Sequence, residues 1–84
     1  MRHRADHNQA EIVKALRKVG VSVHVTSSVG DGFPDLVCSL RKGVKLLEVK
    51  RPGESLTPDQ HFFCRFFPVH VVHTVDEALE VFRD

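Results

Sequence analysis

The fold of this chain is decided by the segment from Gly32 to Lys50, which reads Gly-Phe-Pro-Asp-Leu-Val-Cys-Ser-Leu-Arg-Lys-Gly-Val-Lys-Leu-Leu-Glu-Val-Lys. It contains two apolar stretches, Leu36–Leu40 and Val44–Val49, separated only by Arg-Lys-Gly. Two short apolar stretches joined by so short a connection with a glycine are typical of a β-hairpin. The segment therefore predicts two antiparallel strands, with an aspartate entering the first and a lysine leaving the second.

The register of this hairpin decides which side chains share a face, because a slip of one residue sends every side chain to the other face. If Lys42 and Gly43 form the loop, Asp35 lies opposite Lys50. The apolar face then contains Leu36, Cys38, Leu40, Leu47 and Val49, with Lys45 near the turn. The other face carries Asp35, Glu48 and Lys50, together with Val37, Ser39 and Leu46. A three-residue loop would mix charged and apolar positions on each face, which burial disfavours.

Two carboxylates and a lysine on one sheet face suit the metal-assisted cleavage of a phosphodiester. Asp35 and Glu48 could hold a divalent cation, which polarises the phosphate and lowers the pKa of a bound water. Lys50 could orient that water or neutralise developing negative charge. The same residues also fit a weak cross-strand ion pair on a solvated sheet face. The hairpin alone leaves both interpretations open.

The segments outside the hairpin predict three helices and two more strands. Asn8–Val19 has the apolar spacing of a helix, and Val21–Val25 alternates like a half-buried strand. Thr57-Pro58-Asp59-Gln60 supplies an N-cap, a proline at the first helical position and a capping-box glutamine for a helix that stops at Pro68. Val69–Val72 predicts the fourth strand, and Thr74 starts a last helix. The order αβββαβα indicates an α/β fold.

The length of 84 residues and a hydrophobic content of 42% support one domain, residues 1–84, with one core. A domain of this size leaves much of its surface wet, so a second copy that covers apolar surface is a plausible source of stability. We therefore expect a homodimer. Four of the six phenylalanines, Phe62, Phe63, Phe66 and Phe67, are expected to divide between packing on the sheet and a dimer interface.

The net charge is only +1, because 12 basic residues nearly balance 11 acidic ones. That value does not by itself indicate a nucleic-acid-binding surface. If a metal offsets the charges of Glu11, Asp35 and Glu48, the remainder carries +1 + 3 = +4. Metal loading would thus make the surface more tolerant of phosphate.

The location is expected to be cytoplasmic. Cys38 and Cys64 are too few for a disulfide framework and are expected to be buried thiols in a reducing compartment. The sequence shows no signal peptide and no membrane-spanning stretch, so no membrane partner is expected.

Three ordered motifs resemble those of a known family. They are Gly30-x-Gly32-x-Pro34-Asp35-Leu36-Val37, then Leu47-Glu48-Val49-Lys50, then Leu56-Thr57-x-x-Gln60. In order and spacing they are similar to the VRR-Nuc branch of the PD-(D/E)xK nucleases, specifically its stand-alone, phage-type minimal members. The resemblance implies a restriction-endonuclease-like αβββαβ core with a C-terminal helix and one mixed four-stranded sheet.

The resemblance also implies an activity, namely Mg²⁺- or Mn²⁺-dependent endonuclease cleavage of branched DNA such as four-way (Holliday) junctions. It implies a homodimer without a small-molecule cofactor, which acts on DNA in a bacterial host as the product of a phage or prophage. The alternative is a catalytically inactive DNA-binding or assembly module that keeps the nuclease fold.

Site residues follow from the resemblance position by position. Asp35 and Glu48 are implied as metal ligands with the backbone carbonyl of Val49, and Lys50 as the residue that positions or activates the water. Glu11 resembles the family's helical acid, catalytic and metal-binding, and Gln60 its second-helix glutamine.

Two of these residues also fit a purely structural role. Asn8-x-x-Glu11 and Thr57-x-x-Gln60 each have the spacing of a capping box. The sequence departs from many relatives at Phe33, where a smaller aliphatic residue is common, and this departure bears on substrate specificity.

Overall fold

The computed structural model describes the backbone of residues 4–83 and the side chains of residues 8–83. Its elements are α1 (Arg4–Lys18), β1 (Ser22–Val25), β2 (Leu36–Leu40), β3 (Gly43–Val49), α2 (Pro58–Phe66), β4 (Val69–Val72) and α3 (Val75–Val81). The order αβββαβα is the predicted one. The four strands form one sheet in the order β1-β2-β3-β4. Because β4 pairs parallel to β3 while the other pairs are antiparallel, the sheet is mixed, and the predicted α/β fold class is confirmed.

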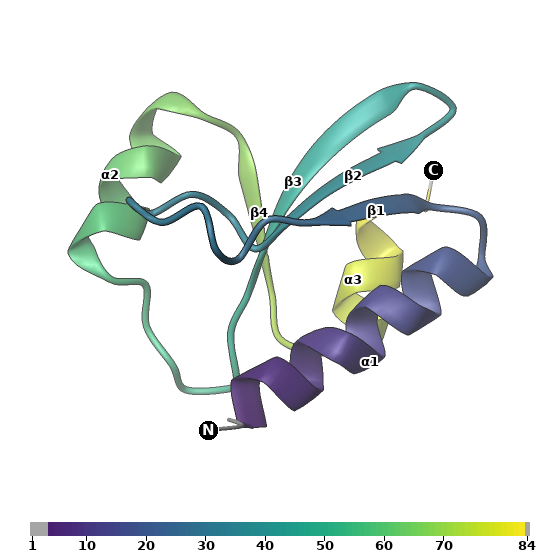
Figure 1. Ribbon diagram of the computed structural model, residues 1–84, viewed down its shortest axis with the longest axis horizontal. Coiled ribbons are helices and arrows are strands. Elements are labelled where there is room, and N and C mark those ends of the chain that lie inside the picture. The colour runs from purple at the N-terminus through teal and green to yellow at the C-terminus, as the bar shows by residue number, and fades with distance from the viewer. Residues whose placement is uncertain (1–3, 84) are drawn as a thin grey trace.

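The helices are distributed unequally around the sheet. α1 and α3 contact each other and pack on the strands, whereas α2 lies apart from both (Figure 1). α1 makes its strand contacts with β1 and β3, and α3 makes them with β4. One layer of two helices therefore covers one face of the sheet.

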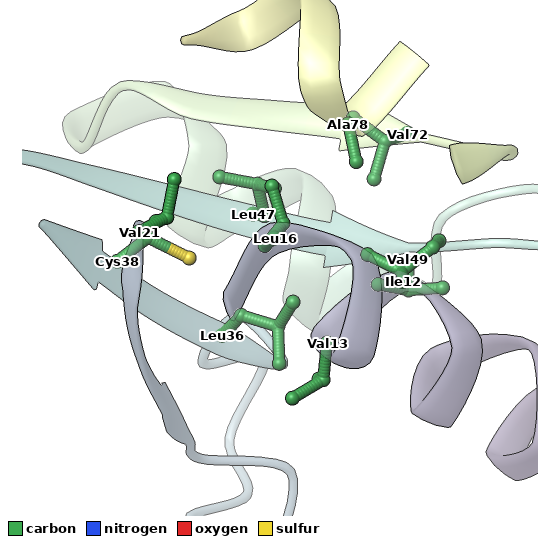
Figure 2. Packing of buried hydrophobic residues seen from close by; sticks show 10 residues of the cluster. All are labelled: Ile12, Val13, Leu16, Val21, Leu36, Cys38, Leu47, Val49, Val72 and Ala78. Atoms are coloured by element: carbon green, nitrogen blue, oxygen red, sulfur yellow. The ribbon is translucent and has the colours of Figure 1, made fainter. Parts of the chain in front are cut away.

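The core lies between this helical layer and the sheet (Figure 2). It consists of Ile12, Val13, Leu16, Val21, Leu36, Cys38, Leu47, Val49, Val72 and Ala78. Four of the five residues predicted for the apolar face of the hairpin are in this cluster, and Leu40 packs against it. The alternation of the hairpin thus sets which face meets the helices.

The predicted register of the hairpin is wrong by two residues. Leu36 pairs with Leu47 and Leu40 with Gly43, so the two loop residues are Arg41 and Lys42. Both have positive φ, at 53° and 68°, as a two-residue turn of the I′ type requires.

The error has a simple physical cause. A shift of two residues leaves every side chain on its face, so burial of the apolar face cannot distinguish the two registers. We expected Lys42 and Gly43 to form the loop, but Gly43 begins β3 instead. Continued by one residue beyond the Leu36–Leu47 pair, the observed register sets Asp35 opposite Glu48 rather than opposite Lys50.

Helix α1 begins four residues before the predicted start, at Arg4. Asn8 consequently lies inside the helix, so the predicted Asn8–Glu11 capping box is wrong. The Asn8 side chain instead donates a hydrogen bond from Nδ2 to the carbonyl oxygen of His73, at 3.3 Å. This bond ties the first part of α1 to the segment between β4 and α3.

The phenylalanines of α2 do not join the core. No residue of α2, all of which the structure describes, is buried, and Phe62 and Phe66 are 61% and 64% exposed. Part of the set Phe62, Phe63, Phe66 and Phe67 was expected to pack on the sheet, and none of the four belongs to the core cluster. Within the described residues, no helix has the length and apolar character needed to cross a membrane.

Candidate nuclease site

Asp35 is fixed at the start of β2 by bonds to the two neighbouring strands. Thr26, just after β1, donates its hydroxyl to the carbonyl oxygen of Pro34 and its backbone N–H to the carbonyl oxygen of Asp35, each at 2.7 Å. On the other side, Asp35 Oδ2 accepts a hydrogen bond from the backbone N–H of Val49 at 2.9 Å. The carboxylate therefore lies directly beside the last residue of β3.

Glu48 and Lys50 lie on the sheet face opposite the helical layer, yet both are buried. Glu48 is 3% exposed and Lys50 is 7% exposed. The Lys50 ammonium nitrogen is 3.7 Å from Glu48 Oε2. Exposed ion pairs of this kind contribute little, but burying two charges is costly unless they are well paired. Burial at this level does not fit the solvated ion pair that the sequence left open.

The pKa of the Glu48 carboxyl lies near neutral pH. Burial raises its pKa to about 7, and the charge of Asp35 and a hydrogen bond with it act in the same direction, while Lys50 opposes the shift. Ionising both of two neighbouring carboxylates in a partly desolvated site costs free energy. A bound cation would relieve this repulsion, so the site favours a positive ligand.

Gln60 contacts the same carboxylate from α2. Its side-chain nitrogen Nε2 donates to Glu48 Oε2 at 3.0 Å. Its amide oxygen accepts from the backbone N–H of Thr57 at 2.9 Å, and its own backbone N–H donates to the Thr57 hydroxyl at 3.2 Å. The predicted capping box is confirmed, and it coexists with the contact to Glu48. One amide thus serves the helix cap with its oxygen and the site with its nitrogen.

Glu11 is exposed on α1. Across residues 8–83, no three or more His, Cys, Asp or Glu side chains lie in a group that could hold a metal ion. Glu11 therefore does not form such a group with Asp35 and Glu48. The structure brings Asp35, Glu48, Lys50 and Gln60 together and leaves Glu11 outside that cluster.

The donor atoms that do converge suit magnesium better than a softer metal. Mg²⁺ prefers oxygen ligands and is typically held by one or two carboxylates, with water and substrate phosphate completing its shell. Asp35 and Glu48 supply the two carboxylates, and the Val49 N–H donates to Asp35 Oδ2. Neither a third carboxylate nor a histidine is needed for such a site.

The residues that hold the site in place were not predicted from the sequence. Thr26 continues the alternation of the preceding strand, and nothing in the sequence marks it as the anchor of Pro34 and Asp35. The edge-to-face contact between the rings of Phe33 and Phe63, with centroids 5.4 Å apart, was also not predicted. The Gly-x-Gly-x-Pro-Asp motif was the available signal, but it did not reveal that Gly32 approaches the backbone of Asp59.

Comparison with known proteins identifies the family. The family model described as the VRR-NUC domain matches residues 3–76. A solved structure titled "VRR_NUC domain" is similar over 98% of this chain and 100% of its own, with a TM-score of 0.74 and 25% sequence identity. No curated protein matches the chain. A VRR-NUC domain implies a nuclease-type function. This chain therefore belongs to the VRR-NUC domain family, as the motifs in its sequence predicted.

Proposed function

We propose that this protein is a Mg²⁺- or Mn²⁺-dependent endonuclease that hydrolyses phosphodiester bonds in branched DNA, with four-way junctions as its substrate. One observation carries the proposal. Glu48 is buried between Asp35, the Lys50 ammonium group at 3.7 Å and the Gln60 amide at 3.0 Å. This cluster combines two acids, a cationic donor and a neutral donor, which is what metal-assisted phosphodiester hydrolysis requires.

Each residue has a separate task in this proposal. Asp35 and Glu48, with the Val49 carbonyl, would hold a divalent cation, which supplies phosphate polarisation and a water of lowered pKa. Lys50 would orient the attacking water or neutralise charge on the phosphate. Gln60 keeps the Glu48 carboxylate in one orientation through its hydrogen bond.

A role for Glu11 remains part of the proposal, as the acid on the first helix. In the protein without ligands, Glu11 does not form a three-residue metal-binding group with Asp35 and Glu48. Its contribution would therefore require the metal and the DNA to be bound. We assign it metal binding together with Asp35 and Glu48, as the family resemblance implies.

The proposal includes a homodimer. The exposed rings of Phe62 and Phe66 on α2, and of Phe67 directly after it, form an apolar surface, with Phe62 and Phe66 in edge-to-face contact at 5.2 Å. Neighbouring exposed aromatic side chains are a common mark of a protein interface. Two symmetric sites would match the two-fold symmetry of a four-way junction. The proposed homodimer is supported by the exposed apolar surface and by the small size of the domain.

The setting belongs to the proposal as well. We place the protein in the bacterial cytoplasm, as the product of a phage or prophage that acts on DNA. The support is the resemblance of this short chain to the phage-type minimal members of the family.

The test is a substrate panel with a matched lysine control. A four-way junction, a flap and a plain duplex are incubated with the protein in Mg²⁺, Mn²⁺ or EDTA. We expect junction cleavage in either metal and none in EDTA. Lys50→Ala should lower the rate by roughly 10²-fold or more, while Lys18→Ala, which removes an exposed charge on α1, should not.

Other outcomes would contradict the proposal in distinct ways. Binding of the junction without cleavage in any metal would favour the inactive DNA-binding module. Cleavage that persists in EDTA or in Lys50→Ala would remove the metal-dependent mechanism from this site. Equal cleavage of the plain duplex and the junction would remove the branched-DNA substrate and leave the chemistry intact.

A further inference from the structure

Helix α2 carries Gln60 to the site, but burial does not hold it there. The hydrophobic core cluster of the described residues is built from α1, α3, β2–β4 and Val21, which directly precedes β1. The helix has no buried residue of its own. Some other contact must determine where its first turn stands relative to Glu48.

The loop before Asp35 makes that contact. Gly32 has a φ of +79°, and a Cβ added to it would overlap the carbonyl group of Asp59 and lie 3.0 Å from the backbone nitrogen of Gln60. Backbone therefore lies directly against backbone at this point, which only glycine permits. Gly30, two residues earlier, has a similar φ of +85°, yet a Cβ there would meet none of the described atoms within 4 Å.

The next residue extends the contact along the helix. The ring of Phe33 packs edge-to-face on Phe63 at 5.4 Å, and Phe63 stacks on Phe67 at 4.3 Å. Pairs of this geometry contribute beyond their buried area. Gly32 therefore contacts the first turn of α2, and Phe33 contacts the turn after it.

The first turn then transmits its position to the site. The capping box fixes the Gln60 side chain against Thr57, so its Nε2 reaches Glu48 only when the turn is in place. The loop that contains Gly32 and Phe33 continues directly into Pro34 and Asp35. Thr26 holds these two residues through hydrogen bonds to their carbonyl oxygens. One loop therefore fixes both Asp35 and, through α2, the amide on Glu48.

We propose that Gly32 and Phe33 are positioning residues, which lock the first turn of α2 onto the loop before Asp35 and so hold the Gln60 amide on Glu48. The structural part of this inference stands without any reaction. Its consequence for rate rests on the proposed nuclease function. Misplacement by about 1 Å of a group that orients a site can lower the rate by roughly 10²-fold.

The matched pair Gly32→Ala and Gly30→Ala separates the close contact from the backbone conformation. Both changes put a side chain at a positive φ in the same loop, but only the first pushes into Asp59. The readout is the side-chain amide signal of Gln60 in ¹⁵N NMR spectra of the full chain, without metal or DNA. Its assignment comes from its loss in Gln60→Leu.

We expect the Gln60 amide signal of Gly32→Ala to move to the position of a solvent-exposed amide, and that of Gly30→Ala to stay as in the unmodified protein. In the junction assay, Gly32→Ala should lower the single-turnover rate by roughly 10- to 100-fold, without a matching loss of DNA affinity. An unchanged amide signal in folded Gly32→Ala would overturn the proposal.

Phe33→Leu decides the matter if Gly32→Ala does not fold. It removes the aromatic edge contact but introduces no backbone strain, and we expect a partial shift of the same amide signal. No shift in folded Phe33→Leu would then overturn the proposal. Because the NMR arm uses no DNA, an inactive protein with the expected shifts would refute only the nuclease function.

Discussion

The side chain of Gln60 is hydrogen-bonded to Glu48 across a gap between two elements, with Nε2 of the first 3.0 Å from Oε2 of the second. The same side chain closes the capping box of α2. The sequence allowed these two roles as alternatives. The structure shows that the two contacts occur together, because an amide has a donor end and an acceptor end.

Substitutions of Thr57 and Gln60 should separate the cap from the contact to Glu48. Thr57→Ala removes one capping bond but leaves the backbone N–H that orients Gln60. It should destabilise the fold by about 1 kcal/mol and leave junction cleavage nearly unchanged. Gln60→Ala should cost a similar stability and also slow cleavage. Urea unfolding and single-turnover assays measure the two effects, and equal loss of cleavage in both variants would contradict this separation.

The stability of the metal-free protein should fall as the pH rises through the range set by Glu48. Burial raises the pKa of this carboxyl from 4.5 to about 7, so the folded state binds the proton more tightly than the unfolded state. Its stabilising contribution is complete below pH 4.5 and is lost as the pH rises to about 7. The loss is on the order of 3 kcal/mol.

Urea unfolding in EDTA at pH 5 and pH 8 tests this pH dependence, with Glu48→Gln as the control for all other titrating groups. The unmodified protein should lose more stability than the variant between the two values. Added Mg²⁺ should restore stability most strongly at pH 8, since a carboxyl must lose its proton to bind metal. Parallel profiles for the two proteins would show that Glu48 titrates normally.

The two cysteines should react at very different rates. Cys38 is fully buried in the core, and burial raises the pKa of its thiol to about 11, whereas Cys64 on α2 is only half-buried. Since the thiolate is the reactive form, a disulfide reagent should modify Cys64 first and Cys38 only on unfolding. Mass spectrometry of the modified peptides measures the order. Fast modification of Cys38 in the folded protein would contradict the core packing.

Phe66→Asp should convert the proposed homodimer to a monomer. Phe66 is 64% exposed beside Phe62 on the apolar surface of α2, and a buried unpaired carboxylate at an interface is costly. Val19→Asp is the control, since Val19 is 57% exposed and follows α1 instead. Sedimentation at micromolar concentration distinguishes the species. A monomeric unmodified protein would remove the dimer from the proposed function.

The element order was predictable because each element carries its own local signal. Alternating valines, helical apolar spacing and the caps at Thr57 and Thr74 are read within a few residues, and the structure has the elements in that order. The start of α1 was missed because the residues before Asn8 are polar and carry no apolar stripe. Local patterns thus determine the elements but define their ends poorly.

The site was predictable in part, and for a different reason. Side chains alternate between the two faces along each strand, and the two registers differ by two residues. Asp35, Glu48 and Lys50 therefore share one face in either register, despite the error in the turn. The approach of Gly32 to Asp59 could not be predicted, because it joins a loop to a helix more than twenty residues away and leaves no periodic trace. Contacts of this kind depend on the folded backbone rather than on local sequence.

The tip of the β2–β3 hairpin lies at the opposite end of the strands from Asp35 and Glu48. Its backbone conformation offers a way to raise the stability of the protein. Arg41 and Lys42 both adopt left-handed backbone, which costs about 1 kcal/mol or more for each such residue. Asparagine and glycine accept this conformation readily. The change Lys42→Gly should therefore raise the urea midpoint without altering the site. Such a stabilised background would keep damaging variants of the distant cluster folded, so that their chemical effects could be measured free of unfolding.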